Sequence, residues 1–320
     1  MTDLNFYKPV RSLTVGEIAD RSGAQLLHGA PSQLILDITT LQNARPGALI
    51  FLPAIFAQED GRCLEDSSAS ALVCEDGVTL STPPSMAILQ INNAKRAFFK
   101  VARLLFEPSA TVETPFVLQG GGAGYVDVSA RLEDNVQIEA GAVIGKDVEI
   151  GSGTIVGPGA VIEDGCCIGR NCRIGEGARL RYTYIGNRVI IHSGVYIGGS
   201  QARFLPTDHK QQAHGILSED RLKNSWFPLV EDNGIFLGRV IIQDYVEIGA
   251  GSVIERGGLP DTVIGEGCRI GALTHIASNV FMGRACLIGS ECVILANTYL
   301  DSATYMVNKE QRSSASFTGF

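Results

Sequence analysis

An aliphatic residue occupies every sixth position of this chain over most of the stretch from Val126 to Met306. An α-helix repeats every 3.6 residues and a strand every two, so a period of six indicates short strands joined by turns. The pattern predicts a parallel β-helix with three strands per coil and roughly eight coils. The spacing shifts at two points and is interrupted once, and its members include Leu132, Ile144, Ile168, Ile191, Ile248, Ile254, Ile276 and Ile294.

A small residue stands two positions before almost every one of these aliphatic residues. Large side chains would then fill the axis of the coil, with small side chains packed beside them. A cysteine at this position packs as a small hydrophobe, as we expect for Cys166, Cys172, Cys268, Cys286 and Cys292. We therefore predict that these cysteines are core residues, and we expect no metal site.

The limits of the repeat suggest the domain organisation. We expect the β-helix to span residues 126–307 and a polar tail to follow at 308–320. A long polar loop should leave the solenoid at 198–239, and it carries His209 and His214. Long ordered loops are often functional, and a merely solvated excursion is the alternative.

Residues 1–110 have the mixed pattern of a small α/β domain, and residues 111–125 are expected to be a linker. Thr14 and Glu17 form a capping-box pattern at the start of a helix that should reach about Ala24. Apolar runs at 34–38, 48–52, 71–75 and 86–91 predict strands. Helical spacing of apolar residues predicts an amphipathic helix over Asn92–Phe106.

The net charge of −8 argues against an electrostatic grip on nucleic acid. The N-terminus has no apolar stretch of signal-peptide length, and no run approaches the roughly 18 apolar residues of a membrane-spanning helix. We therefore expect a soluble cytoplasmic protein that acts on a small or carrier-bound substrate.

Several segments are similar to those of one enzyme family, and they occur in the same order: Gln25-Leu26-Leu27-His28-Gly29, Leu49–Leu52, Ile191–Gly194, Gly238–Ile242, Ile254-Glu255-Arg256-Gly257 and Asp261-Thr262. On these segments the chain resembles the UDP-3-O-acylglucosamine N-acyltransferases of lipid A synthesis, which are hexapeptide-repeat acyltransferases. The resemblance implies a left-handed β-helix assembled as a homotrimer, with no metal or tightly held cofactor. It also implies transfer of a 3-hydroxyacyl chain from acyl carrier protein to the 2-amino group of the UDP-sugar.

The catalytic base is where the chain departs from the family. Family members have a histidine in an Ile-Ala-His-Asn segment, which here reads Ile276-Ala277-Ser278-Asn279. A serine hydroxyl is not basic near neutral pH, whereas an imidazole is. His275 is the nearest substitute, although a spacing of three on an extended strand normally means opposite faces. His209 and His214 of the long loop are the other candidates for the base.

The nucleotide site also departs from the family, which holds uracil between a Phe and a Tyr with an Asn nearby. Phe51 matches the Phe, while Ala54 and Ala57 stand at the other two positions and Phe56 could offer a ring. The predicted substrate-binding residues are therefore Phe51, Phe56 and Asn279. The family's C-terminal helices, which help to engage the carrier protein, have no counterpart in the residues that follow the repeat.

These departures leave three functional readings. The first is an N-acyltransferase of this family that uses a substituted base. The second is a catalytically silent paralogue that serves as a scaffold or a sugar-nucleotide binder. The third is an acyltransferase for a different nucleotide sugar, which could use an acyl-coenzyme A as donor.

Overall fold

The structure is a computed structural model of the 320-residue chain. It describes residues 2–52, 64–78, 80–108, 116–119, 124–199 and 236–312. By their contacts, Arg11–Leu105 belong to one compact unit, and a second unit joins Met1–Val10 to Phe106–Ser200 and Phe236–Phe320. Residues 1–10 therefore group with the solenoid, whereas the sequence pattern places them in the α/β domain.

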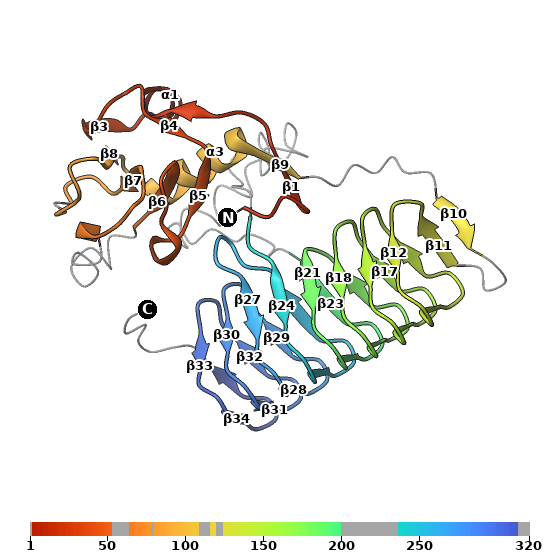
Figure 1. The fold of residues 1–320 in the computed structure, drawn as a ribbon. Coiled ribbons are helices and arrows are strands. Elements are labelled where there is room, and N and C mark those ends of the chain that lie inside the picture. The colour runs from red at the N-terminus through yellow and green to blue at the C-terminus, as the bar shows by residue number, and fades with distance from the viewer. Residues whose placement is uncertain are drawn as a thin grey trace, which may run out of the picture. The chain divides into compact units, whose positions relative to one another are not determined.

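The solenoid consists of three sheets whose strands stack as successive rungs (Figure 1). The ten-stranded sheet contains β10 (Phe116–Gln119), β11 (Gly124–Asp127), β14 (Val143–Ile144), β17 (Val161–Ile162), β20 (Arg179–Leu180), β23 (Tyr196–Gly199), β26 (Val253–Glu255), β29 (His275–Ile276), β32 (Val293–Ile294) and β35 (Gln311–Arg312). One eight-stranded sheet contains β12 (Arg131–Leu132), β15 (Glu149–Ile150), β18 (Cys167–Ile168), β21 (Thr183–Ile185), β24 (Val240–Ile242), β27 (Thr262–Ile264), β30 (Phe281–Met282) and β33 (Tyr299–Leu300). The other contains β13 (Gln137–Ile138), β16 (Ile155–Val156), β19 (Arg173–Ile174), β22 (Ile190–Ile191), β25 (Glu247–Ile248), β28 (Arg269–Ile270), β31 (Leu287–Ile288) and β34 (Tyr305–Met306).

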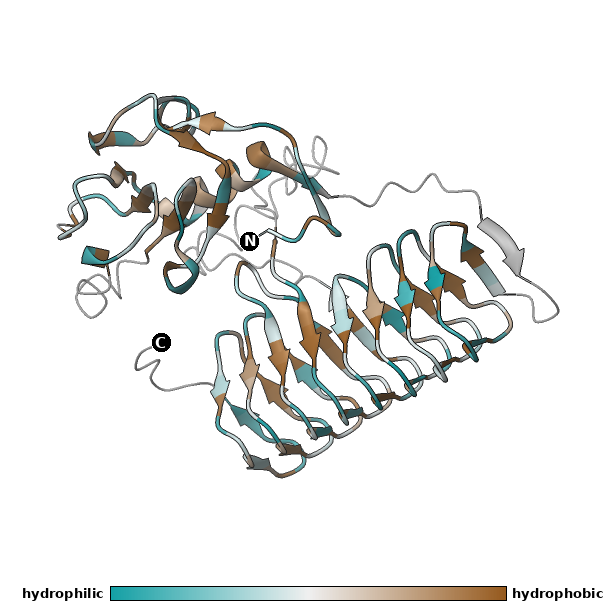
Figure 2. Cartoon of the chain, in the orientation of Figure 1, coloured by the Kyte–Doolittle hydropathy of each residue, from teal (hydrophilic) through white to brown (hydrophobic). Residues whose placement is uncertain are grey.

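The hexad pattern explains this stacking. Its aliphatic residues are buried in the interior of the coil, as Ile144, Ile254 and Ile276 illustrate with no exposed surface. Apolar residues accordingly recur on strand after strand (Figure 2). The five cysteines at the small position are buried free thiols, as predicted. Burial raises the pKa of Cys166 to about 12, which keeps this thiol protonated and unreactive.

The ladder continues across the interruption in the repeat. β21 pairs in parallel with β24, and β23 pairs with β26, so the coil resumes in register after the break. Most of the loop expected at 198–239, including His209 and His214, lies outside the described residues.

Both ends of the solenoid extend beyond the limits expected from the hexads. β10, within the expected linker, pairs antiparallel with β11. β35, within the expected polar tail, pairs in parallel with β32. Backbone hydrogen bonding needs no aliphatic side chain, so the hexad pattern did not reveal these strands.

The α/β unit has a five-stranded sheet in the order β3 (Gln25–His28), β8 (Ala87–Gln90), β7 (Ala71–Cys74), β6 (Ala48–Phe51) and β5 (Asp37–Thr39). β2 (Leu13–Thr14) and β4 (Leu34–Ile35), which flank β3 in the chain, form a separate short antiparallel pair. Two helices of the described residues, α1 (Val15–Ser22) and α3 (Ala94–Leu105), lie close to where the sequence predicts them, and η1 (Leu41–Asn43) is a short 3-10 helix. No helix of the described residues has the length and apolar character to cross a membrane.

The predicted capping box is present at the start of α1. The Thr14 hydroxyl accepts from the backbone N–H of Glu17 at 3.2 Å, and the Glu17 carboxylate accepts from the Thr14 N–H at 2.8 Å. We expect Thr14→Ala to lower the free energy of unfolding by about 1 kcal/mol, because it removes one of these caps. Thr14→Ser should stay close to wild type in urea denaturation, and an equal loss in both variants would contradict the capping role.

Candidate functional site

The predicted base candidate His275 lies in β29 of the ten-stranded sheet, next to the rung formed by β26. β26 and β29 pair in parallel, with Val253 opposite His275 and Ile254 opposite Ile276. Because Ile276 points into the core, its neighbour His275 points away from the coil. Glu255 ends β26 directly after the inward-facing Ile254.

One carboxylate joins His275 to Ser278. His275 Nε2 lies 2.9 Å from Glu255 Oε1, and the Ser278 hydroxyl donates to Glu255 Oε2 at 2.9 Å. The Ser278 backbone N–H donates to the same Oε2 at 3.1 Å. The spacing of three led us to expect His275 and Ser278 on opposite faces. They meet through Glu255 because β29 ends at Ile276, so the alternation of faces along the strand does not continue to Ser278.

The three side chains differ in their access to solvent. The Glu255 side chain is 7% exposed and Ser278 is 5% exposed, whereas the His275 side chain is 40% exposed. The buried carboxylate has three hydrogen-bonding contacts, which offset the cost of removing its charge from water. An ionised carboxylate can only accept, so the proton of a neutral His275 belongs on Nε2. The Nδ1 lone pair of the exposed imidazole is then the group that can take up a proton.

Asn279, the predicted substrate-binding residue of this segment, makes contacts between rungs. Its Oδ1 accepts from the Gly258 N–H at 2.7 Å, and its Nδ2 donates to Asn297 Oδ1 at 2.9 Å. Its own N–H donates to the Thr262 hydroxyl at 3.0 Å. These bonds stabilise the turn beside Ser278, and contact with substrate stays a prediction.

The predicted nucleotide-binding residues belong to the other unit. Phe51 is half-buried in β6, and its ring centroid lies 5.7 Å from that of Phe98 on α3. Phe56, Ala54 and Ala57 lie outside the described residues. The uracil-binding role of Phe51 and Phe56 therefore stays a prediction.

Sequence reasoning did not identify Glu255 as a site residue. The strand opposite it is irregular, since the register shifts between Ile197 and Gly199, and Gly199 pairs with Glu255. Gly198 has a φ of +85°, and a Cβ there would lie 1.7 Å from the Arg181 carbonyl oxygen, so only glycine fits. The available signal was a carboxylate placed where the hexad period breaks, within the Ile-Glu-Arg-Gly segment.

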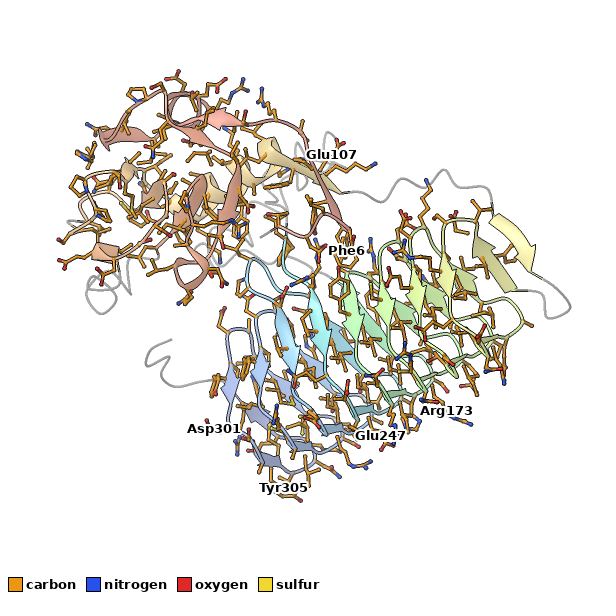
Figure 3. All side chains as sticks on the ribbon, in the orientation of Figure 1. Phe6, Glu107, Arg173, Glu247, Asp301 and Tyr305 are labelled. Atoms are coloured by element: carbon orange, nitrogen blue, oxygen red, sulfur yellow. The ribbon has the colours of Figure 1, made fainter. Side chains whose placement is uncertain are left out.

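A separate groove of about 400 Å³ lies on the outer face of the eight-stranded sheet that contains β25, β28, β31 and β34. It is lined by Glu247, Arg269, Leu287 and Tyr305. Figure 3 labels Glu247 and Tyr305 on this part of the solenoid. His192 Nε2 lies 3.0 Å from Glu247 Oε1, which makes a second histidine–glutamate pair. Its carboxylate is 33% exposed, so the pair lacks the buried partner that His275 has.

Comparison with known proteins agrees with the repeat. The family described as "Bacterial transferase hexapeptide (six repeats)" matches residues 129–164 and 150–182. Together with the three parallel sheets, this match identifies the solenoid as the left-handed parallel β-helix of hexapeptide repeats and confirms the predicted fold class.

Two relatives extend the comparison over most of the chain. A UDP-3-O-acylglucosamine N-acyltransferase of Rhodopseudomonas palustris (strain BisB5) is 37% identical over 91% of this chain and 75% of its own. The enzyme of that name from Rhizobium meliloti (strain 1021) is 35% identical over 89% of this chain and 75% of its own. A solved UDP-N-acetylglucosamine acyltransferase from Campylobacter jejuni matches 58% of this chain and 66% of its own at 16% identity, with a TM-score of 0.34.

Proposed function

The chain belongs to the UDP-3-O-acylglucosamine N-acyltransferase family, and from this premise we propose that it acylates the 2-amino group of a UDP-3-O-acylglucosamine, with His275 as the general base. The observation that carries the proposal is the half-exposed imidazole held at 2.9 Å by the buried Glu255 carboxylate. A base must be oriented as well as accessible, and this pair meets both requirements. Ser278, at the family's histidine position, binds the other oxygen of that carboxylate.

The reaction follows from ordinary acyl transfer. The sugar amine attacks the carbonyl carbon of an acyl thioester, so that a C–N bond forms and the C–S bond breaks. His275 Nδ1 accepts the proton that the amine loses, and the imidazolium returns it to the departing thiolate. Glu255 stabilises the imidazolium while it carries that proton. The products are the amide and a free thiol.

The donor and the assembly follow from the family resemblance. The thioester would be a 3-hydroxyacyl chain on acyl carrier protein, and the active protein would be a homotrimer. Size-exclusion chromatography with light scattering measures the assembly. A monomer at assay concentrations would remove the trimer from the proposal.

An acylation assay with purified protein, UDP-3-O-acylglucosamine and a 3-hydroxyacyl carrier-protein thioester tests the activity. We expect an N-acylated product, identified by mass spectrometry, at a rate well above the no-enzyme control. Absence of product above that control would contradict the proposal, and the catalytically silent paralogue would then be the remaining reading. Turnover only with another nucleotide sugar or with acyl-coenzyme A would change the substrate while keeping the reaction.

Replacement of Ser278 separates its role from that of His275. We expect Ser278→Ala to lower kcat by less than about tenfold, because Glu255 Oε2 keeps its hydrogen bond from the backbone N–H of residue 278. A general base or nucleophile at this position would instead cost about 10²–10⁴-fold. Steady-state kinetics at saturating donor decide between these two outcomes.

A further inference from the structure

The hydroxyl of Tyr7 lies where three distant segments of the solenoid unit meet. Tyr7 belongs to β1 (Tyr7–Pro9), which pairs antiparallel with β9 (Phe106–Pro108). Its hydroxyl donates to the carbonyl oxygen of Phe236 and accepts from Nη1 of Arg256. Tyr7 has no exposed surface, so both hydrogen bonds are sheltered from water.

Arg256 is a buried cation held largely by aromatic rings. The residue is 8% exposed, and its guanidinium carbon lies 3.8 Å from the centroid of the Tyr182 ring. The rings of Phe236 and Tyr7 lie within 6 Å, at 5.8 and 5.9 Å. Ring faces attract a guanidinium most strongly where water is excluded. The Tyr7 hydroxyl adds the hydrogen-bond acceptor that the rings do not supply.

The phenol of Tyr7 is kept neutral. Burial raises the pKa of Tyr7 above its ordinary value, against the opposing effect of the Arg256 charge. A neutral phenol can donate and accept at once, as the contacts with Phe236 and Arg256 require.

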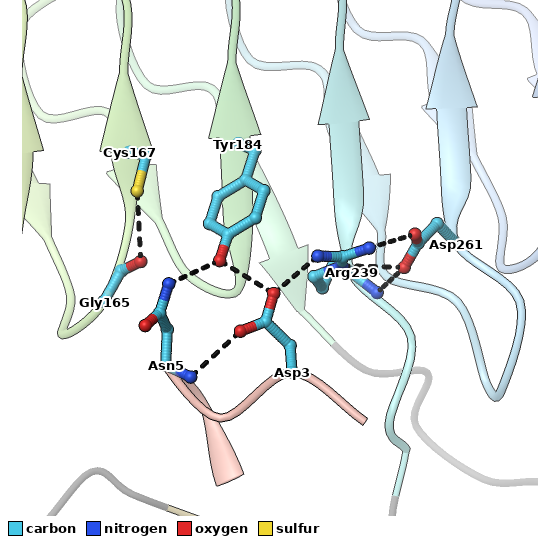
Figure 4. A network of polar contacts seen from close by, with 7 residues as sticks. All are labelled: Asp3, Asn5, Gly165, Cys167, Tyr184, Arg239 and Asp261. Carbon is cyan, nitrogen blue, oxygen red and sulfur yellow. Dashed lines mark hydrogen bonds and ion pairs between the residues drawn. The ribbon is translucent and has the colours of Figure 1, made fainter. Parts of the chain in front are cut away.

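A second network anchors the same N-terminal segment a few residues earlier (Figure 4). The Tyr184 hydroxyl donates to Asp3 Oδ2 at 2.7 Å and accepts from Asn5 Nδ2 at 2.7 Å. Arg239 pairs with Asp3 and, through Nη2 at 2.8 Å, with Asp261. Among the described residues, the hydrogen bonds and ion pairs of this network do not reach the side chains of Glu255 or Arg256, so it offers a matched comparison for Tyr7.

Arg256 follows Glu255 directly in the chain. Its backbone N–H donates to the Gly199 carbonyl at 3.0 Å, opposite the irregular part of β23. The two ends of Arg256 are therefore held separately, its backbone by β23 and its guanidinium by Tyr7 and Tyr182. The peptide that carries Glu255 has little freedom to rotate while both ends are held.

We propose that Tyr7 and Arg256 are positioning residues that hold the Glu255 carboxylate against His275 and Ser278. The catalytic part of this inference rests on the proposed function. The structural part does not, because the Ser278 N–H donates to Glu255 Oε2 and thus reports where that carboxylate lies.

The test compares Tyr7→Phe with Tyr184→Phe. Each variant removes one hydroxyl that anchors the N-terminal segment, but only Tyr7→Phe removes the acceptor of Arg256. We expect Tyr7→Phe to lower kcat about tenfold with KM changed less than about twofold, since the substrate contacts stay in place. Tyr184→Phe should keep kcat within about twofold of wild type. Equal losses of kcat in the two variants would indicate general loosening and overturn the proposal.

Hydrogen exchange of the Ser278 amide supplies a readout that does not need turnover. We expect exchange at this amide to accelerate about tenfold in Tyr7→Phe and to stay unchanged in Tyr184→Phe. Unchanged exchange in Tyr7→Phe would overturn the positioning role even if kcat fell. If wild-type protein gives no acylated product, the proposed function fails, and the exchange result still decides whether Tyr7 positions Glu255.

Discussion

Replacing His275 with glutamine should lower kcat by about 10²–10⁴-fold, the usual cost of losing a general base. Glutamine is similar in size to histidine and can still donate to Glu255 Oε1, so the neighbouring contacts survive. What it lacks is a basic nitrogen near neutral pH. The side chain is 40% exposed and fills no core position, so we expect little change in the melting temperature. Single-turnover kinetics with pre-bound substrates would isolate this loss in the chemical step.

His192→Gln is the matched control for this variant. His192 is also half-exposed on a coil, and it also lies close to a glutamate oxygen, at 3.0 Å. We expect its kcat to stay within about twofold of wild type. Wild-type activity in His275→Gln would exclude His275 as the base, and His209 and His214 would then be the remaining candidates.

Glu255→Gln should be nearly as damaging, although it changes only one atom of the side chain. The amide nitrogen is a donor, so it cannot accept from both His275 and Ser278 as the carboxylate does. If it donates to His275 Nε2, the imidazole proton moves to Nδ1 and the lone pair needed for the amine is lost. The loss of the carboxylate charge also removes stabilisation from the imidazolium. We expect kcat to fall by about 10²–10⁴-fold, as in other sites where a histidine loses its orienting carboxylate.

The control here is Glu247→Gln, which alters the more exposed carboxylate beside His192. Its kcat should remain close to wild type, and circular dichroism should show both variants folded. A Glu255→Gln protein with more than half of the wild-type kcat would show that His275 needs no orienting carboxylate. An unfolded Glu255→Gln would be separated from a catalytic loss by its spectrum.

The coil was predictable because one chemical rule repeats along it. Each inward aliphatic residue, such as Ile254 or Ile276, must be buried, and burial of many such residues at one spacing leaves few other folds. The capping box of α1 was predictable for a similar reason, since Thr14 and Glu17 act within one turn of chain. β10 and β35 were missed because their pairing depends on backbone groups, which every sequence carries.

The site was only partly predictable because its contacts cross rungs at a break in the period. His275 and Ser278 could be singled out from the sequence, but their shared partner Glu255 lies on the preceding rung. They meet because β29 ends at Ile276, between them, and the geometry of the chain after a strand end does not follow from hexad spacing. Tyr7 lies further still from its partner Arg256 along the chain, and a lone aromatic residue near a terminus carries no pattern to read.

The stacking of the rungs also determines where unfolding by heat or denaturant would begin, relative to the candidate site. In a one-dimensional stack, opening begins at an end, where a rung has a neighbour on one side only. In the ten-stranded sheet, β35 and β32 stand between the C-terminal end and β29. These outer strands can unfold and refold locally while β26 and β29 stay paired with a strand on each side. The rungs that carry His275 and Glu255 can therefore stay folded under conditions in which the C-terminal strands of the solenoid have already unfolded.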